Sequence, residues 1–341
     1  MRAAVLRARG RIEIDRAYPE SRLNPGDIRL RVGVSGICGS DLHEFVAGPL
    51  NLPMPAVLGH EFCGEVVEAG ADVRGFEPGD RAIGVIYAGC GRCEYCRRGD
   101  FTLCDMRAMA VAERNGSFTE FVTAPAHQMF LVPPGVSDDE AAIMEPAAVA
   151  CHAIRRSGLN LGQRVVVMGA GPIGLLVTAL ARAAGADRIV VVEPGPNRRE
   201  LALKMGADVA LDVGDEVDGP VMELTESRGA DIVFEASGNA AAFTQAQHLV
   251  RKQGRIVMVA VYEGRKLELR ANRLVGNEVD LIASYWANEA DFSRAVNLVA
   301  RRTLDVRPLI SARYPLDDIQ KAFEILAADR GSYGKILVDC K

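Results

Sequence analysis

The chain has 341 residues, of which 49% are hydrophobic and 25% are charged, and its formal net charge is −5. This length is long for one hydrophobic core, so two domains are expected, in a chain with the composition of an ordinary globular protein. The acidic charge gives no general attraction to nucleic acid or anionic membranes, so neither is expected as a partner. No apolar signal segment follows Met1, and eight cysteines fit a reducing compartment, which predicts a cytoplasmic location.

The first third of the chain carries short β-like runs separated by turns that contain Gly and Pro. Such runs are residues 27–34, 65–67 and 81–86, and typical turn sequences occupy residues 24–27 and 77–80. The pattern predicts a compact, mostly antiparallel β domain.

From about residue 161, apolar strands alternate with helical segments, which is typical of an α/β fold with a doubly wound parallel sheet. The expected strands are residues 164–168, 188–192, 231–234 and 255–261. The expected helices of this part are residues 173–184, 198–205 and 240–251. In the tail, helices are expected at residues 291–302 and 317–328, before a strand at 335–339.

The uncharged run 165–181 raises the question of a membrane span. Glycines and a proline interrupt it in the middle, and it is shorter than a bilayer requires. A buried strand, a tight turn and a helix explain it better. The turn reads G-x-G-x-x-G and comprises Gly169, Ala170, Gly171, Pro172, Ile173 and Gly174.

This motif predicts a dinucleotide site, because it stands between a strand and a helix. Gly169 allows the tight turn, Gly171 lets a pyrophosphate approach the backbone, and Gly174 allows close packing of the helix on the strand. An acidic residue, Glu193, ends the next strand and is placed to bind the adenosine ribose hydroxyls. It would repel a 2′-phosphate, which favours NAD over NADP, although Arg198 and Arg199 could bind a phosphate. The alternative is a Gly-rich turn without a ligand.

One short loop holds four cysteines, Cys90, Cys93, Cys96 and Cys104. Four thiolates this close in sequence can converge on one tetrahedral ion, so they predict a closed, structural Zn²⁺ site. The arginines of the loop suggest a zinc ribbon on nucleic acid instead, but its acidic residues and the acidic chain oppose that reading. The other thiols, Cys63, Cys151 and Cys340, are interpreted as inert and buried.

A second, dispersed set consists of Cys38, His60, Glu61 and Glu145. A thiolate, an imidazole and carboxylates suit a catalytic Zn²⁺ that keeps an exchangeable position. Taken alone, His60 would be better explained as a partly buried, hydrogen-bonded histidine.

These residues resemble those of a known family. The segment 59–80 is similar to the zinc signature of medium-chain zinc-dependent alcohol dehydrogenases. The four-cysteine loop and the Gly169 motif follow in the order of that family. Cys38-Gly39-Ser40-Asp41 together with Glu145-Pro146 resembles its polyol (sorbitol) and 2,3-butanediol dehydrogenase branch, whereas threonine 3-dehydrogenases usually have Thr in place of Ser40. The matching positions of the segment are Gly59, His60, Glu61, Gly64, Val66, Gly70, Val73, Gly79 and Asp80.

The resemblance implies a domain plan. A GroES-like catalytic domain is expected at residues 1–148, with its structural zinc loop at about 88–106. A Rossmann-type NAD-binding domain is expected at 149–285, and residues 286–341 would return to the catalytic domain. A homodimer or homotetramer is the assembly that the family suggests.

The family's zinc positions fall on Cys38, His60 and Glu61, and Glu145 stands where ethanol-type enzymes have a zinc-binding cysteine. Whether Glu61 or Glu145 binds the metal directly is left open. The implied activity is zinc-dependent transfer of hydride from a secondary alcohol, a polyol or vicinal diol, to NAD⁺. The alternatives are a threonine or sugar-acid dehydrogenase, or a non-catalytic protein that senses the cofactor or binds through its zinc loop.

Ser40 is interpreted as the first acceptor of the alcohol's proton, and His43 as the shuttle that follows. The alternative is a capping box in which Ser40 or Asp41 caps a short helix, with His43 or Glu44 one turn later.

By resemblance, Ser237 in the turn 235–238 and the strand end Val259 to Val261 flank the nicotinamide. Ordinary strand ends are the alternative. Tyr285 and Trp286 are placed near a subunit edge and the substrate cleft, where packing across a dimer is at least as plausible as substrate contact.

Overall fold

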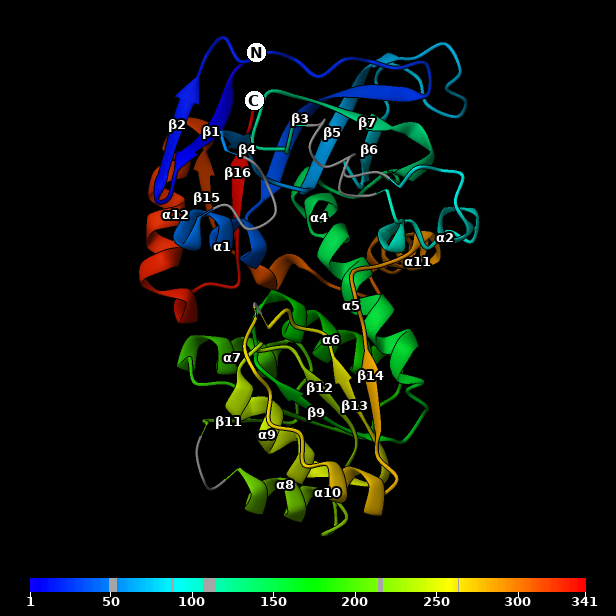
Figure 1. Cartoon of the computed structure of the whole chain (residues 1–341), viewed down its shortest axis with the longest axis vertical. Coiled ribbons are helices and arrows are strands. Elements are labelled where there is room, and N and C mark those ends of the chain that lie inside the picture. The colour runs from blue at the N-terminus through cyan, green and yellow to red at the C-terminus, as the bar shows by residue number, and fades with distance from the viewer. Residues whose placement is uncertain (49–53, 87–88, 107–114, 214–216, 263) are drawn as a thin grey trace. The chain divides into compact units, whose positions relative to one another are not determined.

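The computed structural model describes residues 1–48, 54–86, 89–106, 115–213, 217–262 and 264–341. The chain forms two compact units, shown in Figure 1. Unit 1 comprises Met1–Ala148 and Ala287–Lys341, and unit 2 comprises Val149–Trp286. Each unit has its own sheet and its own core.

Unit 1 is built on a seven-stranded sheet with the order β15-β16-β3-β5-β6-β8, in which β7 also pairs with β3, and on a small sheet β2-β1-β4. Most pairs are antiparallel, but β15 and β16 run parallel. The strands are β1 (Ala3–Ala8), β2 (Arg11–Asp15), β3 (Asp27–Gly36), β4 (Ala56–Val57), β5 (Glu61–Ala69), β6 (Arg81–Gly84), β7 (Phe121–Pro125), β8 (Met129–Leu131), β15 (Ile310–Pro315) and β16 (Lys335–Asp339).

The last segment of the chain completes the sheet and the core of unit 1. Strand β16 pairs with β3, where Leu337 is opposite Gly36. Helix α12 contributes Phe323, whose ring lies 5.1 Å from that of Phe45 and 5.8 Å from that of Phe118, centroid to centroid. All three rings are buried. The helices of this unit are α1 (Gly39–Ala47), α2 (Glu94–Arg97), α4 (Asp138–Ala142), α11 (Glu289–Ala300) and α12 (Ile319–Ala328), and α5 (Met144–Ser157) crosses into unit 2.

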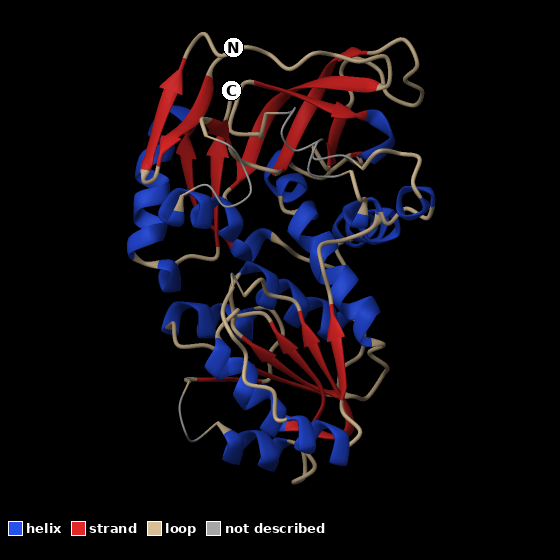
Figure 2. Cartoon of the chain, in the orientation of Figure 1, coloured by secondary structure: helices blue, strands red, loops and turns tan. Residues whose placement is uncertain are grey.

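Unit 2 is a six-stranded parallel sheet with the order β11-β10-β9-β12-β13-β14. Figure 2 shows these strands running side by side with helices around them. The central strands are continuously buried because both faces are covered, as parallel sheets require. The strands are β9 (Arg164–Met168), β10 (Arg188–Val192), β11 (Val209–Leu211), β12 (Ala230–Glu235), β13 (Val250–Met258) and β14 (Asp280–Ala283). The helices are α6 (Pro172–Ala183), α7 (Pro196–Lys204), α8 (Asp218–Leu224), α9 (Ala240–Leu249) and α10 (Ala271–Gly276).

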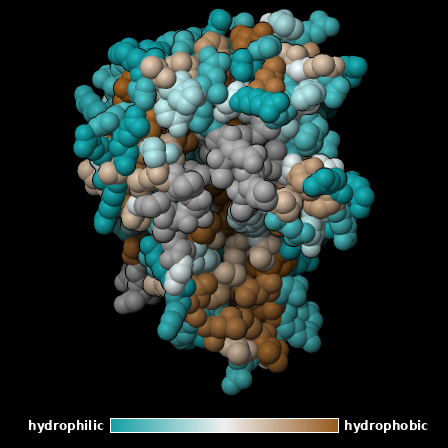
Figure 3. Space-filling model, turned by 45° about the horizontal axis from the view of Figure 1, so that its top comes forward, coloured by the Kyte–Doolittle hydropathy of each residue, from teal (hydrophilic) through white to brown (hydrophobic). Residues whose placement is uncertain are grey.

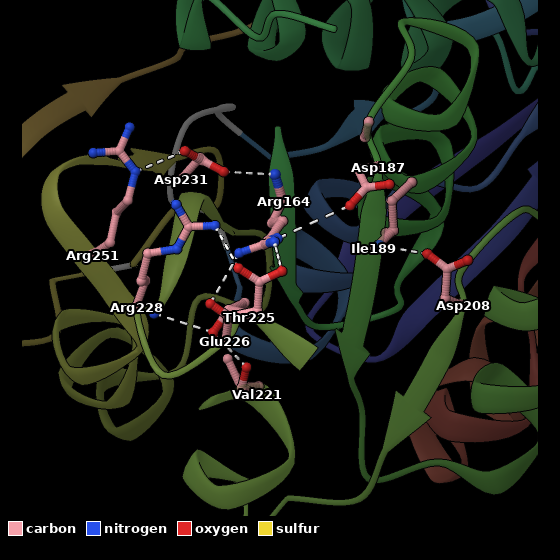
Figure 4. Close-up of polar contacts among 12 residues, drawn as sticks. Arg164, Asp187, Ile189, Asp208, Val221, Thr225, Glu226, Arg228, Asp231 and Arg251 are labelled. Atoms are coloured by element: carbon pink, nitrogen blue, oxygen red, sulfur yellow. Dashed lines mark hydrogen bonds and ion pairs between the residues drawn. The ribbon is translucent and has the colours of Figure 1, made fainter. Parts of the chain in front are cut away.

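A polar network ties the amino ends of these strands together (Figure 4). The carboxylate of Asp231 accepts the backbone N–H of Arg164 and the Nε–H of Arg251, both at 2.7 Å. The guanidinium of Arg164 donates to Glu226 at 2.6 Å and to the carbonyl of Thr225 at 3.0 Å. These bonds fix the starts of β9, β12 and β13, and leave their carboxyl ends for the site described below.

The predicted fold class is confirmed: a parallel α/β unit accompanies a mostly antiparallel β unit. The predicted strands 164–168, 188–192 and 335–339 coincide with β9, β10 and β16. The prediction of a helix to residue 251 is wrong, because α9 ends at Leu249 and Val250 already begins β13. Strand β13 therefore starts five residues before the expected range and ends at Met258. Within the described residues, no helix is long and apolar enough to span a membrane.

Candidate active site and metal centres

Cys38, His60 and Glu61 form the mixed-ligand group. Cys38 precedes α1, and His60 and Glu61 stand at the start of β5. Strand pairing brings them together, because Gly36 at the end of β3 is opposite Glu61. One ligand atom of each side chain lies within 4.8 Å of the ligand atoms of the other two. Glu145, on α5, is buried but is not part of this group.

Asp41 organises the mixed-ligand group from behind. One of its carboxylate oxygens accepts the backbone N–H of Cys38 at 2.9 Å. The other accepts the N–H of Gly59 at 3.1 Å and lies 3.6 Å from Nδ1 of His60. A carboxylate behind a ligand histidine fixes the orientation of the ring and strengthens its metal binding.

Lys335 is a site residue that the sequence did not reveal. Its Nζ lies 2.6 and 2.8 Å from the two carboxylate oxygens of Glu61 and donates to the carbonyl of Ile37 at 3.2 Å. Both side chains of the pair are almost fully buried, at 2% and 1% exposure. The pair forms across Gly36, where an added Cβ would come 2.5 Å from Oε2 of Glu61. A side chain at this position would therefore displace the carboxylate of Glu61.

The charges around the mixed-ligand group oppose the effect of burial. Burial lowers the pKa of His60, but the charges of Asp41 and Cys38 and hydrogen bonds to both raise it well above its ordinary value. Burial likewise lowers the pKa of Lys335, and the charges of Glu61, Cys38 and Glu145 raise it above its ordinary value. Glu145 thus acts electrostatically on the same lysine as Glu61 does.

The donor set fits a zinc ion. Sulfur, imidazole nitrogen and carboxylate oxygen are the atoms that Zn²⁺ prefers, and three protein ligands are typical of catalytic sites. Cys38, His60 and Glu61 would hold such an ion, with Asp41 as the carboxylate behind the histidine.

The capping alternative for Ser40 is wrong. Helix α1 begins at Gly39 with Cys38 as its N-cap, and Asp41 at the third helical position accepts the N–H of Cys38. Ser40 is exposed in the first turn, and His43 is partly buried one turn later. Asp41 serves both the helix start and His60, so one carboxylate links local structure to the site.

Cys90, Cys93, Cys96 and Cys104 form the four-cysteine group. Their sulfurs all lie within 4.8 Å of one another. Backbone N–H groups point at them: Cys93 donates to Cys90 at 3.3 Å, and Cys90 donates to Cys104 at 3.2 Å. Hydrogen bonds from the N–H groups of Arg92 and Cys93 lower the pKa of Cys90 to about 6, whereas burial raises the pKa of Cys96 to about 12. The set fits a closed tetrahedral Zn²⁺.

The loop of the four-cysteine group is fastened to the start of α11. The side-chain amide of Asn288 donates to Asp100 at 3.0 Å, and the N–H of Glu289 donates to the carbonyl of Gly99 at 3.1 Å. The rings of Phe101 and Phe292 lie 6.2 Å apart, centroid to centroid. These contacts anchor the loop to α11.

The Gly-rich motif of unit 2 has the geometry of a dinucleotide loop. It joins β9 to α6, whose N-cap is Gly171 and whose first residues are Pro172 and Ile173. An added Cβ at Gly174 would come 2.0 Å from the carbonyl oxygen of Gly169, so this glycine permits the close approach of helix and loop. At Gly171 such a Cβ would meet only Arg198, at 3.9 Å, which leaves this backbone open to a ligand. Helix α6, which has twelve residues, begins beside that space, so the positive end of its dipole lies there.

Glu193 lies at this loop. Its carboxylate accepts the N–H of Ala170 at 2.7 Å and that of Gly195 at 3.0 Å, and the side chain is buried. Arg199 donates to the carbonyl of Glu193 at 2.8 Å and pairs with Asp212, so it is engaged in holding the turn. The carboxylate of Glu193 is therefore fixed beside the Gly-rich motif and is suited to bind ribose hydroxyls.

Ser237 lies against the same loop, because an added Cβ at Gly169 would meet its atoms at 2.9–3.0 Å. Its hydroxyl donates to Glu235 and accepts the N–H of Asn239 at 3.1 Å. Val259 bonds through its N–H to the carbonyl of Glu235 at 2.9 Å, and Val261 is 68% exposed. The hydroxyl of Ser237 is thus occupied within the protein.

Tyr285 and Trp286 follow the edge strand β14, and their rings meet edge to face with centroids 6.4 Å apart. Tyr285 is 44% exposed. The remaining thiols Cys63, Cys151 and Cys340 are buried, as predicted. Burial raises the pKa of Cys63 and of Cys340 to about 12, so both are unreactive thiols at neutral pH.

Comparison with known proteins agrees with this arrangement. Residues 24–134 match the family described as alcohol dehydrogenase GroES-like domain, and residues 172–301 match the family described as zinc-binding dehydrogenase. A sorbitol dehydrogenase from Halalkalibacterium halodurans is 33% identical over 311 residues, which are 90% of this chain and 90% of that protein.

Two solved structures are similar over nearly the whole chain. A zinc-binding dehydrogenase from Sinorhizobium meliloti, determined with NADP bound, is 33% identical with a TM-score of 0.90, over 99% of this chain and 98% of the other. The 2R,3R-butanediol dehydrogenase from Bacillus subtilis is 31% identical with a TM-score of 0.89, over 99% of each chain. The chain therefore belongs to the zinc-binding, medium-chain alcohol dehydrogenase family and is an oxidoreductase of its polyol-like branch.

Proposed function

We propose that the protein oxidises a secondary alcohol, a polyol or vicinal diol, and transfers the hydride to NAD⁺. The observation that carries this proposal is the mixed-ligand group: sulfur, nitrogen and oxygen donors converge apart from the four-cysteine group. The names of the similar proteins, a sorbitol dehydrogenase and a 2R,3R-butanediol dehydrogenase, support this substrate class.

Bound zinc would supply a Lewis acid that makes a nearby hydroxyl acidic, and bound NAD⁺ would supply the hydride acceptor. The chain's own residues do the rest. Cys38, His60 and Glu61 hold the metal, and Asp41 orients His60. Lys335 keeps the charge of Glu61 balanced in a buried setting. Glu145 is the neighbouring carboxylate. A structure with zinc bound would show whether it contacts the metal directly or indirectly.

The alcohol's proton must leave the site, and we assign Ser40 as its first acceptor and His43 as the next carrier. Ser40 follows Cys38 by two residues and its side chain is exposed in the first turn of α1. His43 lies one turn further along the same helix. Ser40→Ala should lower kcat while leaving the zinc content unchanged, and an unaltered kcat would remove Ser40 from this role.

NAD is the preferred cofactor in this proposal, because the buried carboxylate of Glu193 lies at the fingerprint and would repel a 2′-phosphate. The NADP-bound relative and the proximity of Arg198 to Gly171 make NADP the specific rival. Values of kcat/KM for both cofactors separate the two. A higher value with NADP would overturn the preference.

A panel of zinc-loaded assays tests the function: sorbitol-type polyols, 2,3-butanediol, threonine and sugar acids, each with NAD⁺, followed by NADH absorbance. Cys38→Ser should abolish turnover and preserve NADH binding, measured by fluorescence. Cys63→Ser is the matched control, because Cys63 is buried but belongs to neither cysteine-containing group. Full activity of Cys38→Ser would contradict an active-site role for the mixed-ligand group.

We further propose a homodimer or homotetramer that works in the cytoplasm. Figure 3 shows an apolar area in its lower part, and unit 2 exposes Val275 at 78% and Leu281, on its edge strand β14, at 41%. Eight free thiols suit a reducing compartment. Light scattering after gel filtration would reveal the assembly, and a monomer at micromolar concentration would refute it.

A further inference from the structure

Glu235 is a buried acid that neither metal group uses. It is the last residue of β12 and is 0% exposed. Its carboxylate accepts the N–H groups of Ser237 at 2.9 Å and of Gly238 at 3.2 Å, and also the hydroxyls of Ser237 and of Tyr262, the latter at 2.5 Å. A carboxylate this deeply buried needs such donors to remain in place. The four bonds therefore fix the donors as firmly as they hold the acid.

The turn that Glu235 holds lies against the dinucleotide loop. The N–H of Ala236 donates to the carbonyl of Met168, the last residue of β9, at 2.9 Å. Ser237 fills the space beside Gly169, where an added Cβ would come within 2.9–3.0 Å of its atoms. A shift of the turn would therefore change the surface next to the Gly-rich motif.

Tyr262 ties a second segment to the same carboxylate. It follows β13, whose end is already bonded to β12 through the N–H groups of Val259 and Ala260 and the carbonyl of Glu235. Its ring meets Phe243 edge to face with centroids 6.2 Å apart. Burial and the hydrogen bond to Glu235 raise the pKa of Tyr262, so its hydroxyl remains a donor. Beyond it, Arg265 donates to the carbonyl of Gly238 at 2.7 Å and closes the connection.

The strand order decides which half of a dinucleotide meets this cluster. Dinucleotides bind at the carboxyl edge of such a sheet, with the pyrophosphate at the fingerprint after β9. Glu193, the residue suited to the adenosine ribose, stands at the end of β10 on one side of β9. Strands β12 and β13 lie on the other side. The nicotinamide half of the cofactor would therefore lie at the side of the sheet edge where Glu235 and Tyr262 hold the backbone in place.

We propose that Glu235 and Tyr262 are positioning residues that hold the turn 236–238 and the strand end 259–261 in place for the nicotinamide half of the cofactor. This inference deepens the proposed function and rests on it, because it requires the chain to bind a nicotinamide dinucleotide. Neither side chain needs to touch the cofactor, since the acceptor atoms of Glu235 are occupied by the protein's own donors.

Fragment binding tests the proposal. The affinities of NADH and of ADP-ribose, which lacks only the nicotinamide, are measured by calorimetry for the wild type, Tyr262→Phe, Glu235→Gln and the double variant. We expect Tyr262→Phe to weaken NADH binding about fivefold to tenfold, because it deletes one hydrogen bond to a charged group, and to leave ADP-ribose binding within about twofold. Glu235→Gln places an amide donor among donors and should weaken NADH binding further. The double variant should resemble Glu235→Gln, because both changes break the same contact.

Matched controls are Glu226→Gln, which changes an exposed carboxylate of unit 2, and Tyr314→Phe, which deletes a hydroxyl in unit 1. Both should bind the two ligands as the wild type does. If the wild type binds neither ligand, the proposed function fails. If the wild type binds both and the variants lose both equally, or lose neither, the positioning role fails while the proposed function stands. Tyr262→Phe removes a single oxygen atom, so it carries the test alone if Glu235→Gln does not fold.

Discussion

The buried pair of Lys335 and Glu61 makes a quantitative prediction about stability. In the variant Lys335→Met, the carboxylate of Glu61 keeps its 1% exposure but loses a partner that approaches both of its oxygens, at 2.6 and 2.8 Å. Removing one member of a buried ion pair typically costs about 3–5 kcal/mol, because the other charge is left uncompensated. We expect a loss in this range for unit 1 of the metal-free protein. Zinc would compensate the same carboxylate, so the loss should be smaller in the zinc-loaded protein.

Urea unfolding followed by circular dichroism measures this loss in both metal states. The single tryptophan, Trp286, belongs to unit 2 and reports on that unit separately by fluorescence. Its transition should not move. Lys341→Met is the matched control, because that lysine is 63% exposed and pairs with Asp138 at the surface, where such pairs contribute at most about 1 kcal/mol.

A second variant separates the effect of charge balance from ordinary packing effects. The double change Glu61→Gln with Lys335→Met removes both charges, and replacing a whole buried pair is often close to neutral. The double variant should therefore be more stable than Lys335→Met alone. If metal-free Lys335→Met loses less than about 1 kcal/mol, or if the double variant is no more stable than the single one, Lys335 does not balance the charge of Glu61.

Three further results are expected. Asp41→Asn should weaken zinc binding at the mixed-ligand group about 10- to 100-fold, measured by chelator competition, because His60 loses the carboxylate behind it. Cys104→Ser should cost the four-cysteine group its zinc, so that metal analysis finds one ion fewer per chain. Burial raises the pKa of Glu140, but its bonds to the capping residue of α4 and to Arg302 hold that pKa below the ordinary value. Its contribution to stability is therefore present above the unfolded pKa and is lost as pH falls through the lower folded value. The stability difference between the wild type and Arg302→Met should shrink over that acidic range.

Local patterns made the nucleotide unit and the four-cysteine group predictable, whereas the mixed-ligand group was assigned through the resemblance to a family. Strand β9 is a continuous apolar run followed at once by the Gly-rich motif, and the turn chemistry fixes where the strand ends and α6 begins. The four-cysteine group is equally local, since its ligands span residues 90–104. Zinc accepts few kinds of donor, so residue type and spacing alone restrict the choice.

Element boundaries were less predictable, because long-range pairing decides them. The segment 250–251 continues the polar and apolar pattern of α9, yet Val250 pairs with Ala230 and so belongs to β13. Helix α5, which carries Glu145, is absent from the predicted elements, although Pro146 stands near its start, where a helix tolerates proline. Tertiary pairing overrides local preference at Val250, whereas the local sequence at α5 permits the helix that forms.

Charge balance explains why the mixed-ligand group depends on the far end of the chain. Asp41, Glu61 and Glu145 are all buried. An uncompensated buried charge costs about 3–5 kcal/mol of stability. The backbone N–H groups of Cys38 and Gly59 serve Asp41, whereas Glu61 is balanced by a cation. Any segment that the fold brings close can supply one, so spacing along the sequence carries no signal for it. Here β16 pairs with β3 and delivers Lys335 across 274 residues to Glu61. The C-terminal strand is therefore part of the site, and a truncation before it should cost the mixed-ligand group its charge balance as well as its sheet.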